Sequence, residues 1–221
     1  MADLAPLLES SVGDSVRSSK ANSAEGKPYA PLPDGQSIRM LILEPGELAD
    51  PLKGRLEVTS IDSAGNYEAL SYVWGTSNQS GNISIANGDN EWPVDLTASL
   101  KETLLRLRFT DRRRRLWVDQ ICINQSDVAE RSQQVQFMNR IYKRASHILV
   151  WLGPDDTSLA KPAFELVHSL DHIFQDEIKR AEFSTAAMKD LGQQSRERWN
   201  TLDHLTGRPW VSKKTTIGRE L

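Results

Sequence analysis

Cysteine is nearly absent from this sequence, because Cys122 is the only one among its 221 residues. A single thiol excludes an intrachain disulfide and argues against a zinc site built on cysteine ligands. Such scarcity is typical of proteins from reducing compartments. Isoleucines flank Cys122 on both sides, which favours a buried and inert thiol over a nucleophile.

The sequence also lacks a long apolar run and an excess of either charge. No stretch approaches the ~20 apolar residues that span a bilayer, and residues 1–20 lack the apolar core of a secretory signal. The 27 basic and 30 acidic residues give a net charge of −3, which argues against binding to nucleic acid. We therefore expect a cytoplasmic protein without a membrane span and without a nucleic-acid partner.

Composition divides the chain into a polar leader and one domain. Residues 1–36 are rich in serine, alanine, proline, glycine and charge, so they bury too little apolar surface to offset the entropy of ordering. This segment is expected to be disordered. Residues 37–221 are long enough for one domain.

Residue patterns in the first half of this domain predict mainly strands. Alternating, β-branched or aromatic residues favour strands over residues 37–44, 55–61 and 67–74. Apolar residues on both sides of Asn87-Gly88 predict an antiparallel β-hairpin, because this dipeptide favours a tight turn. A helix is expected to follow over residues 97–107, where leucines recur at helical spacing.

The second half contains a βαβ pattern. Residues 116–125 read LWVDQICINQ, which begins as a strand and ends as a polar loop. A helix over residues 127–145 and a continuously apolar run at 147–152 follow. The two strands of such a unit should run parallel, and an apolar run of this kind suits a strand covered on both faces. We expect an α/β fold, with a mixed sheet that joins a parallel βαβ core to the antiparallel β-hairpin.

The helix over residues 127–145 has the clearest pattern in the chain, and two further helices are expected over 158–180 and 195–205. Asp127 followed by Glu130 three residues later predicts a capping box. Apolar residues that recur at intervals of three, four and seven positions along this helix predict one buried apolar stripe. Its members are Val128, Val135, Met138, Tyr142 and Ala145.

Polar side chains follow the predicted strand that begins at Leu116, at the position where open α/β sheets build binding sites. Asp119 can bind ribose hydroxyls there, or it can accept backbone N–H groups as a loop cap. The amides of Asn124 and Gln125 suit either a ligand or the loop backbone. Capping already explains Glu130, and the alternative role is that of a catalytic base.

Aromatic residues mark the end of the strand predicted at 67–74. Tyr72, Trp74 and Gly75 can wall a nucleotide site by stacking, or the two rings can pack in the core. His168 and His172 have a spacing that can ligate a metal, but no third ligand completes the pattern, so no metal is expected.

Two of these segments resemble the leading motifs of the heterokaryon incompatibility (HET) domain of filamentous fungi. They are YEALSYVWG at residues 67–75 and LWVDQICINQ at 116–125. Residues 130–153 continue the same pattern, and IRMLILEPG before the first motif is similar to the usual opening of the family. The resemblance covers residues 38–153, with a weaker tail to Trp210.

What the resemblance implies is a cytoplasmic effector of fungal nonself recognition and programmed cell death. HET domains are also thought to be distantly similar to TIR domains, which implies a flavodoxin-like sheet. The first implied mechanism is a signalling module with protein partners that include further copies of itself. The second implied mechanism is hydrolysis of NAD as a substrate, because some TIR domains cleave NAD with a glutamate. No cofactor is certain in either mechanism.

The third HET motif has roughly the form R-P-W, then R-x-W, then Q-E. This chain keeps Arg208, Pro209 and Trp210 and then departs from the pattern, so it is expected to be truncated or divergent after about residue 210. Glu220 matches the motif glutamate only with a one-residue shift. In the hydrolase hypothesis, Asp119 orients the ribose and Glu220 stabilises the oxocarbenium character.

A nonfunctional or regulatory HET fragment is the remaining hypothesis. The mechanistic hypotheses share the expectation that the loops after Trp74 and after Asp119 line one crevice.

Overall fold

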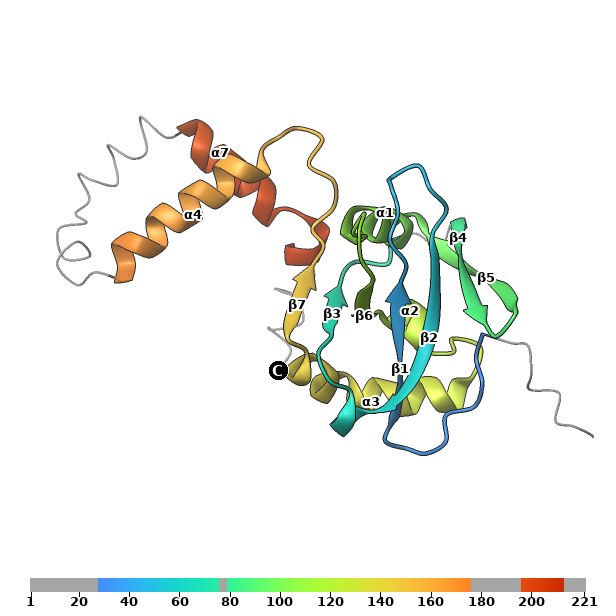
Figure 1. Ribbon diagram of the computed structural model, residues 1–221. Coiled ribbons are helices and arrows are strands. Elements are labelled where there is room, and N and C mark those ends of the chain that lie inside the picture. The colour runs from blue at the N-terminus through green and yellow to red at the C-terminus, as the bar shows by residue number, and fades with distance from the viewer. Residues whose placement is uncertain (1–27, 76–78, 176–195, 213–221) are drawn as a thin grey trace, which may run out of the picture.

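The structure is a computed structural model that describes residues 28–75, 79–175 and 196–212. A mixed seven-stranded sheet with helices around it forms an α/β fold, as predicted (Figure 1). The strands are β1 (Ser37–Leu43), β2 (Lys53–Ser60), β3 (Glu68–Ser71), β4 (Gln79–Asn87), β5 (Asn90–Thr97), β6 (Arg114–Trp117) and β7 (His147–Val150). The helices are the short η1 (Ile61–Ser63), α1 (Ala98–Leu107), α2 (Asp119–Cys122), α3 (Val128–Arg144), α4 (Ala160–Gln175) and α7 (Arg196–Thr206).

The strand order β5-β4-β2-β1-β6-β3-β7 shows how the βαβ unit is built into the sheet. β6 and β7 have the same direction, as predicted, because each pairs in parallel with β3. They are not neighbours, however, since Glu68 of β3 pairs with Leu116 on one side and His147 on the other. The β4–β5 hairpin also forms as predicted, and Gly88 at its turn has a φ of 61°. It joins the sheet through parallel pairing of β4 with β2.

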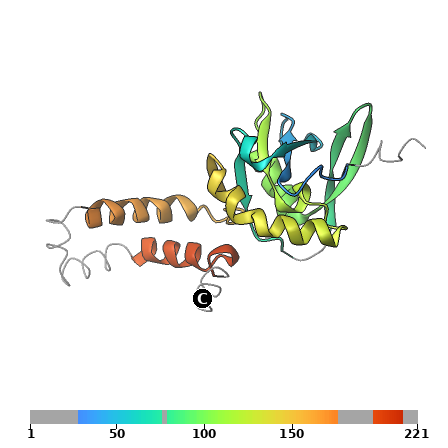
Figure 2. The same cartoon turned by 90° about the horizontal axis from the view of Figure 1, so that it is seen from below.

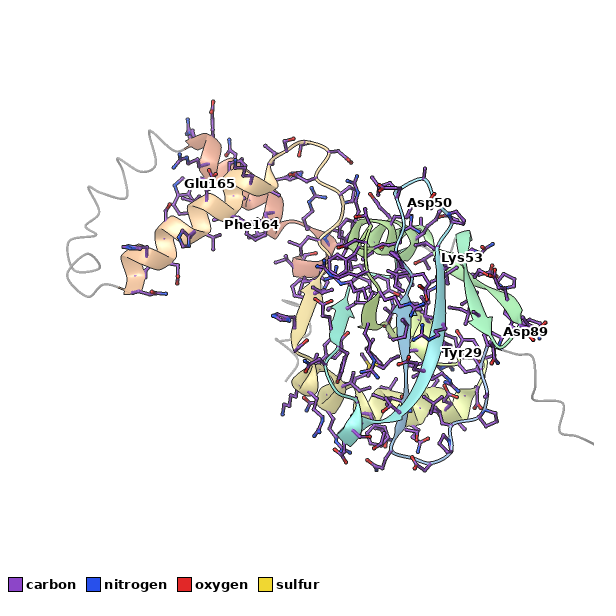
Figure 3. The ribbon with its side chains drawn as sticks, in the orientation of Figure 1. Tyr29, Asp50, Lys53, Asp89, Phe164 and Glu165 are labelled. Atoms are coloured by element: carbon purple, nitrogen blue, oxygen red, sulfur yellow. The ribbon has the colours of Figure 1, made fainter. Side chains whose placement is uncertain are left out.

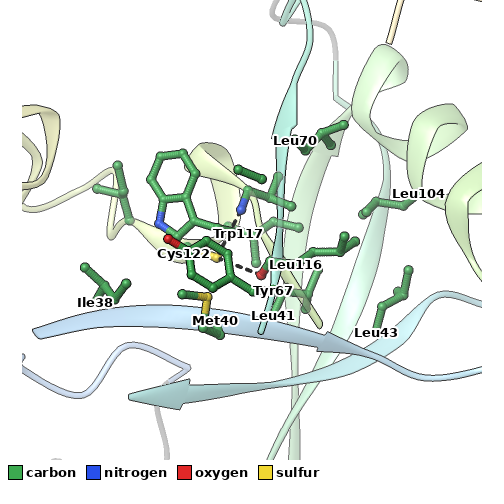
Figure 4. Packing of buried hydrophobic residues seen from close by; sticks show 14 of the residues in the cluster. Ile38, Met40, Leu41, Leu43, Tyr67, Leu70, Leu104, Leu116, Trp117 and Cys122 are labelled. Carbon is green, nitrogen blue, oxygen red and sulfur yellow. Dashed lines mark hydrogen bonds between the residues drawn. The ribbon is translucent and has the colours of Figure 1, made fainter. Parts of the chain in front are cut away.

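The core lies on both sides of β1 and β6. All seven residues of β1 are buried, as a central strand requires. Figure 4 shows Met40, Tyr67, Leu116 and Trp117 packed together on one side of this strand. The ring of Trp117 meets that of Tyr142 edge to face, with centroids 5.6 Å apart, so helix α3 is held against the sheet by aromatic packing.

The buried face of α3 differs from the predicted stripe. Val128 and Val135 are 64% and 53% exposed, so their predicted burial is wrong. The fully buried positions instead include Gln134, whose Nε2 donates a hydrogen bond to the Ser37 carbonyl over 2.9 Å. A polar side chain can face the core when its hydrogen bonds are made, and residue hydrophobicity alone does not identify such a position.

Strand β7 also differs from its prediction. The apolar run indicated a strand covered on both faces, but β7 is the last strand of the described sheet. Ile148 is 52% exposed and Val150 is 42% exposed. The prediction of coverage on both faces is therefore wrong, because it assumed a central place in the sheet that β3 occupies instead.

Two segments lie outside the sheet and its covering helices. Helices α4 and α7 pack against each other and project from the side of the molecule that carries β7 (Figures 1 and 2). Phe164 on α4 is 54% exposed there (Figure 3). At the other end of the chain, residues 28–36 lie against the domain, where the Ala30 carbonyl accepts a hydrogen bond from Arg39 over 2.6 Å. In the described ranges, no helix combines the length and apolarity that crossing a bilayer requires.

Candidate functional site

The loop after β3 and the helix after β6 meet at one edge of the sheet. Trp74 Nε1 donates a hydrogen bond to Asp119 Oδ2 over 2.9 Å. This contact forms because β3 and β6 are parallel neighbours, so their carboxyl ends lie side by side. The two sequence motifs thus lie side by side at this edge. Gly75 follows with a φ of 75°, a conformation that glycine adopts readily and other residues rarely do.

Hydrogen-bond donors surround the Asp119 carboxylate. Its Oδ1 accepts the backbone N–H of Gln120 over 2.7 Å, in addition to the Trp74 bond at Oδ2. Burial raises the pKa of Asp119 above its ordinary value, and these hydrogen bonds oppose the shift. The Tyr72 hydroxyl donates to Gln120 Oε1 over 3.1 Å, and burial raises its pKa as well. The protein itself therefore satisfies both carboxylate oxygens of Asp119.

The remaining candidates of the second motif hold the loop between α2 and α3. Asn124 Oδ1 accepts the Ser126 N–H over 3.2 Å, and Gln125 Nε2 donates to the Asp119 carbonyl over 2.8 Å. Both amides thus bind loop backbone. The thiol of Cys122, two residues earlier, is buried as predicted, and burial raises its pKa to about 12.

Glu130 belongs to a buried ion pair at the start of α3. Asp127 Oδ1 accepts the Glu130 N–H over 3.0 Å, which is the expected half of the capping box. The Glu130 carboxylate does not complete that box. It forms a bidentate ion pair with Arg39, with Nη2 to Oε2 at 3.0 Å, and it also accepts the Asn124 N–H over 2.7 Å.

A cavity of about 290 Å³ opens beyond the carboxyl ends of β3 and β7. Its walls come from the first motif, from α1, from the turn after β7 and from the segment after α7. The lining residues are Val73, Gly75, Ser99, Glu102, Trp151, Leu152, Gly153, Pro154, Arg208, Pro209 and Trp210. Asp119, Asn124 and Gln125 are not among them, so the loop after Trp74 lines this cavity without the loop after Asp119.

Sequence reasoning missed most of this lining. Gly153 directly follows the strand predicted at residues 147–152, so the strand-end rule was sufficient to select it, whereas Trp151 was assigned to the strand itself. Ser99 and Glu102 gave no signal, because they lie on an ordinary amphipathic helix. The position of Trp210 depends on tertiary contact, since its Nε1 donates to Ser71 Oγ over 3.0 Å, across 139 positions of sequence.

Glu220 lies outside the described residues, so its proposed catalytic role has no structural counterpart here. Among the residues that the structure describes, no group of three or more histidine, cysteine or acidic side chains is placed to hold a metal ion.

Comparison with known proteins identifies the family. Residues 67–215 match the sequence model of a family described as heterokaryon incompatibility protein (HET). The chain is 43% identical over 133 residues to heterokaryon incompatibility protein 6, OR allele, of Neurospora crassa. That alignment covers 55% of this chain and 20% of the relative, so the chain spans about a fifth of the relative's length. No solved structure matches. Because the family model covers more than half of the sequence, the chain belongs to the heterokaryon incompatibility (HET) family.

Proposed function

We propose that this chain acts in fungal heterokaryon incompatibility, as a cytoplasmic effector domain of nonself recognition and programmed cell death. The family match and the similarity to an incompatibility protein support this role. We further propose that the domain signals by self-assembly. The observation that carries this mechanism is strand β7, which is the edge strand of the sheet in the described residues and contains no acidic residue, lysine, arginine or proline.

The two edges of the sheet differ in how they can pair with another chain. β5, at one edge, carries Glu91, Pro93 and Asp95, and charges and proline oppose edge-to-edge pairing. β7, at the other edge, has the sequence HILV and contains neither an acidic residue nor proline. An edge strand presents unpaired N–H and C=O groups that can pair with another strand, so β7 is the edge suited to association.

A groove beside β7 extends this surface. Its volume is about 600 Å³, and its lining is mostly apolar. The lining residues are Ser71, Met138, Asn139, Tyr142, Ile148, Val150 and Trp210. We propose that a second copy of the chain pairs its own β7 with this edge and places apolar side chains in the groove. Such a contact uses the same surface on both copies, as two-fold symmetric dimers do.

The geometry at Asp119 is consistent with this mechanism. A residue that orients a substrate needs acceptor atoms directed at the ligand. Here Trp74 and the Gln120 N–H already bind the two carboxylate oxygens. Asp119 thus joins the two sequence motifs and leaves neither carboxylate oxygen without a protein donor.

The test measures association and biological effect with the same pair of variants. Val150→Lys places a charge on the β7 edge, whereas Val58→Lys places one on β2, where the native side chain is also exposed, at 45%. Sedimentation velocity should show concentration-dependent oligomers for the wild type and for Val58→Lys, but monomers for Val150→Lys. Expression in a fungal host should arrest growth with the first two proteins only. Equal behaviour of the two variants in both assays would contradict assembly through β7.

A second candidate function is cleavage of NAD by a TIR-like mechanism. It is favoured by the parallel β6-β3-β7 arrangement and by the cavity at the carboxyl ends of β3 and β7, where flavodoxin-like folds bind ligands. Incubation of concentrated protein with NAD tests it. Release of nicotinamide that is lost in Asp119→Ala and Glu220→Ala would support hydrolysis, and absence of release from the wild type would exclude it for this chain.

A further inference from the structure

The cavity beyond β3 and β7 contains a guanidinium that pairs with no carboxylate of the described residues. Arg208 lines the cavity, and its Nη1 is 3.3 Å from the position that a Cβ would take on Gly153. Glu102 also lines the cavity, and within the described ranges neither its carboxylate nor Arg208 forms an ion pair. A half-buried cation beside apolar walls loses part of its hydration, and a ligand anion is the partner that would compensate this loss.

Backbone donors lie beside the same guanidinium. The N–H groups of Leu152 and Gly153 donate to no residue that the structure describes. Gly153 has a φ of 102°, which glycine adopts readily, and its lack of a side chain leaves room for Arg208 beside the backbone. Successive backbone N–H groups in a turn form concave anion sites, and an adjacent guanidinium strengthens them by charge-assisted hydrogen bonds.

The other walls are suited to a planar ring. Trp151 and Trp210 both line the cavity, and the hydrogen bond from Trp210 Nε1 to Ser71 fixes one of the indoles. Aromatic side chains bind the faces of nucleobases by stacking. The carboxylate of Glu102 can accept hydrogen bonds from the hydroxyl groups of a sugar.

The size of the cavity restricts the ligand. Its volume of about 290 Å³ is at the lower end of the roughly 300–1,000 Å³ range of ligand sites. We propose that the cavity binds a nucleoside monophosphate, with the phosphate on Arg208 and the N–H groups of Leu152 and Gly153, the base against an indole, and the sugar at Glu102. This inference concerns binding alone and does not depend on β7 assembly or on bond cleavage.

The experiment titrates the full chain with AMP, adenosine and inorganic phosphate, and follows tryptophan fluorescence and isothermal heat. AMP should bind saturably and more tightly than adenosine or phosphate, because only AMP carries both the ring and the anion. Arg208→Gln should weaken AMP binding at least about tenfold, the effect expected when a charge-assisted hydrogen bond is lost. It should leave the weaker adenosine binding unchanged.

Arg106→Gln is the matched control, since Arg106 is exposed on α1 and lines no part of this cavity. It should bind AMP as the wild type does. Glu102→Gln should weaken binding of AMP and adenosine but not of phosphate. Circular dichroism and the oligomer distribution are recorded for every variant, so a folding defect or an assembly defect is recognised separately.

Three results would overturn the proposal. The first is no saturable AMP binding by the folded wild type. The second is equal AMP affinity in Arg208→Gln and Arg106→Gln. The third is NAD binding more than about tenfold tighter than AMP, a difference of ~1.4 kcal/mol, because it would show that the ligand needs more room than this cavity provides.

Discussion

Replacement of Glu130 by alanine should destabilise the fold by about 3–5 kcal/mol, the cost of removing one partner from a buried ion pair. Its partner, Arg39, is 1% exposed and Glu130 is 9% exposed, so water cannot replace the lost carboxylate. Among the residues that the structure describes, Arg39 keeps the carbonyls of Ala30 and Cys122 as acceptors, at 2.6 and 3.4 Å. The Asn124 N–H loses its acceptor too. The variant therefore leaves a buried cation and a backbone donor incompletely bonded.

Urea unfolding followed by far-UV circular dichroism measures this loss, because the unfolding free energy extrapolates linearly to zero denaturant. Asp62→Ala is the matched control. Asp62 also pairs with two arginines, Arg140 at 3.1 Å and Arg144 at 3.2 Å, but it is 61% exposed. Its removal should cost less than about 1 kcal/mol, as exposed ion pairs do.

A second comparison separates the charge from the packing. Glu130→Gln should cost less than Glu130→Ala, because an amide oxygen still accepts from Arg39. The double variant Arg39→Met/Glu130→Leu should recover much of the loss, since apolar replacement of a whole buried pair is often neutral. If Glu130→Ala were no more destabilising than Asp62→Ala, the reasoning that burial governs the energy of the Arg39–Glu130 pair would be refuted.

Three further predictions concern the loops around the site. Burial raises the folded-state pKa of Asp119 above its ordinary value of 3.8. Between these two pKa values the native state therefore binds more protons than the unfolded state. The free energy of unfolding should fall as pH rises through that window. Asp119→Asn should remove this part of the pH dependence, and unfolding free energies measured at several pH values would contradict it if the slopes were equal. Burial raises the pKa of the Cys122 thiol to about 12, so a thiol reagent near neutral pH should modify it only after unfolding; rapid modification of the native protein would refute this. Gly75→Ala should cost about 1–2 kcal/mol, because a φ of 75° is strained for alanine, and an unchanged thermal midpoint would show that the loop relaxes instead.

Local chemistry was sufficient to predict most individual elements. The Asn87-Gly88 turn, the cap at Asp127 and strand β1 depend on residues that are close in sequence, and each formed where the pattern indicated. The meeting of Trp74 with Asp119 was predictable for a related reason, because carboxyl ends of parallel strands share one edge of a sheet.

Other features depended on partners far away in the chain. The predicted stripe on α3 included Val128 and Val135, which are exposed. Gln134 is buried instead, because its side chain forms a hydrogen bond with the Ser37 carbonyl, which lies 97 positions earlier in the sequence. Hydrophobicity cannot anticipate burial that a distant hydrogen bond makes favourable. The cavity likewise required Arg208 to reach the turn after β7.

The sequence by itself determined the fold class, the main helices and strands and the membership of the HET family, because periodicity, turn residues and motifs each involve residues that are close in sequence. Only the tertiary structure decided the strand order, which inserts β3 between β6 and β7 and leaves β7 as an edge strand of the described sheet. Strand order results from competition among long-range pairings, and short-range patterns do not record which pairing has the lowest free energy.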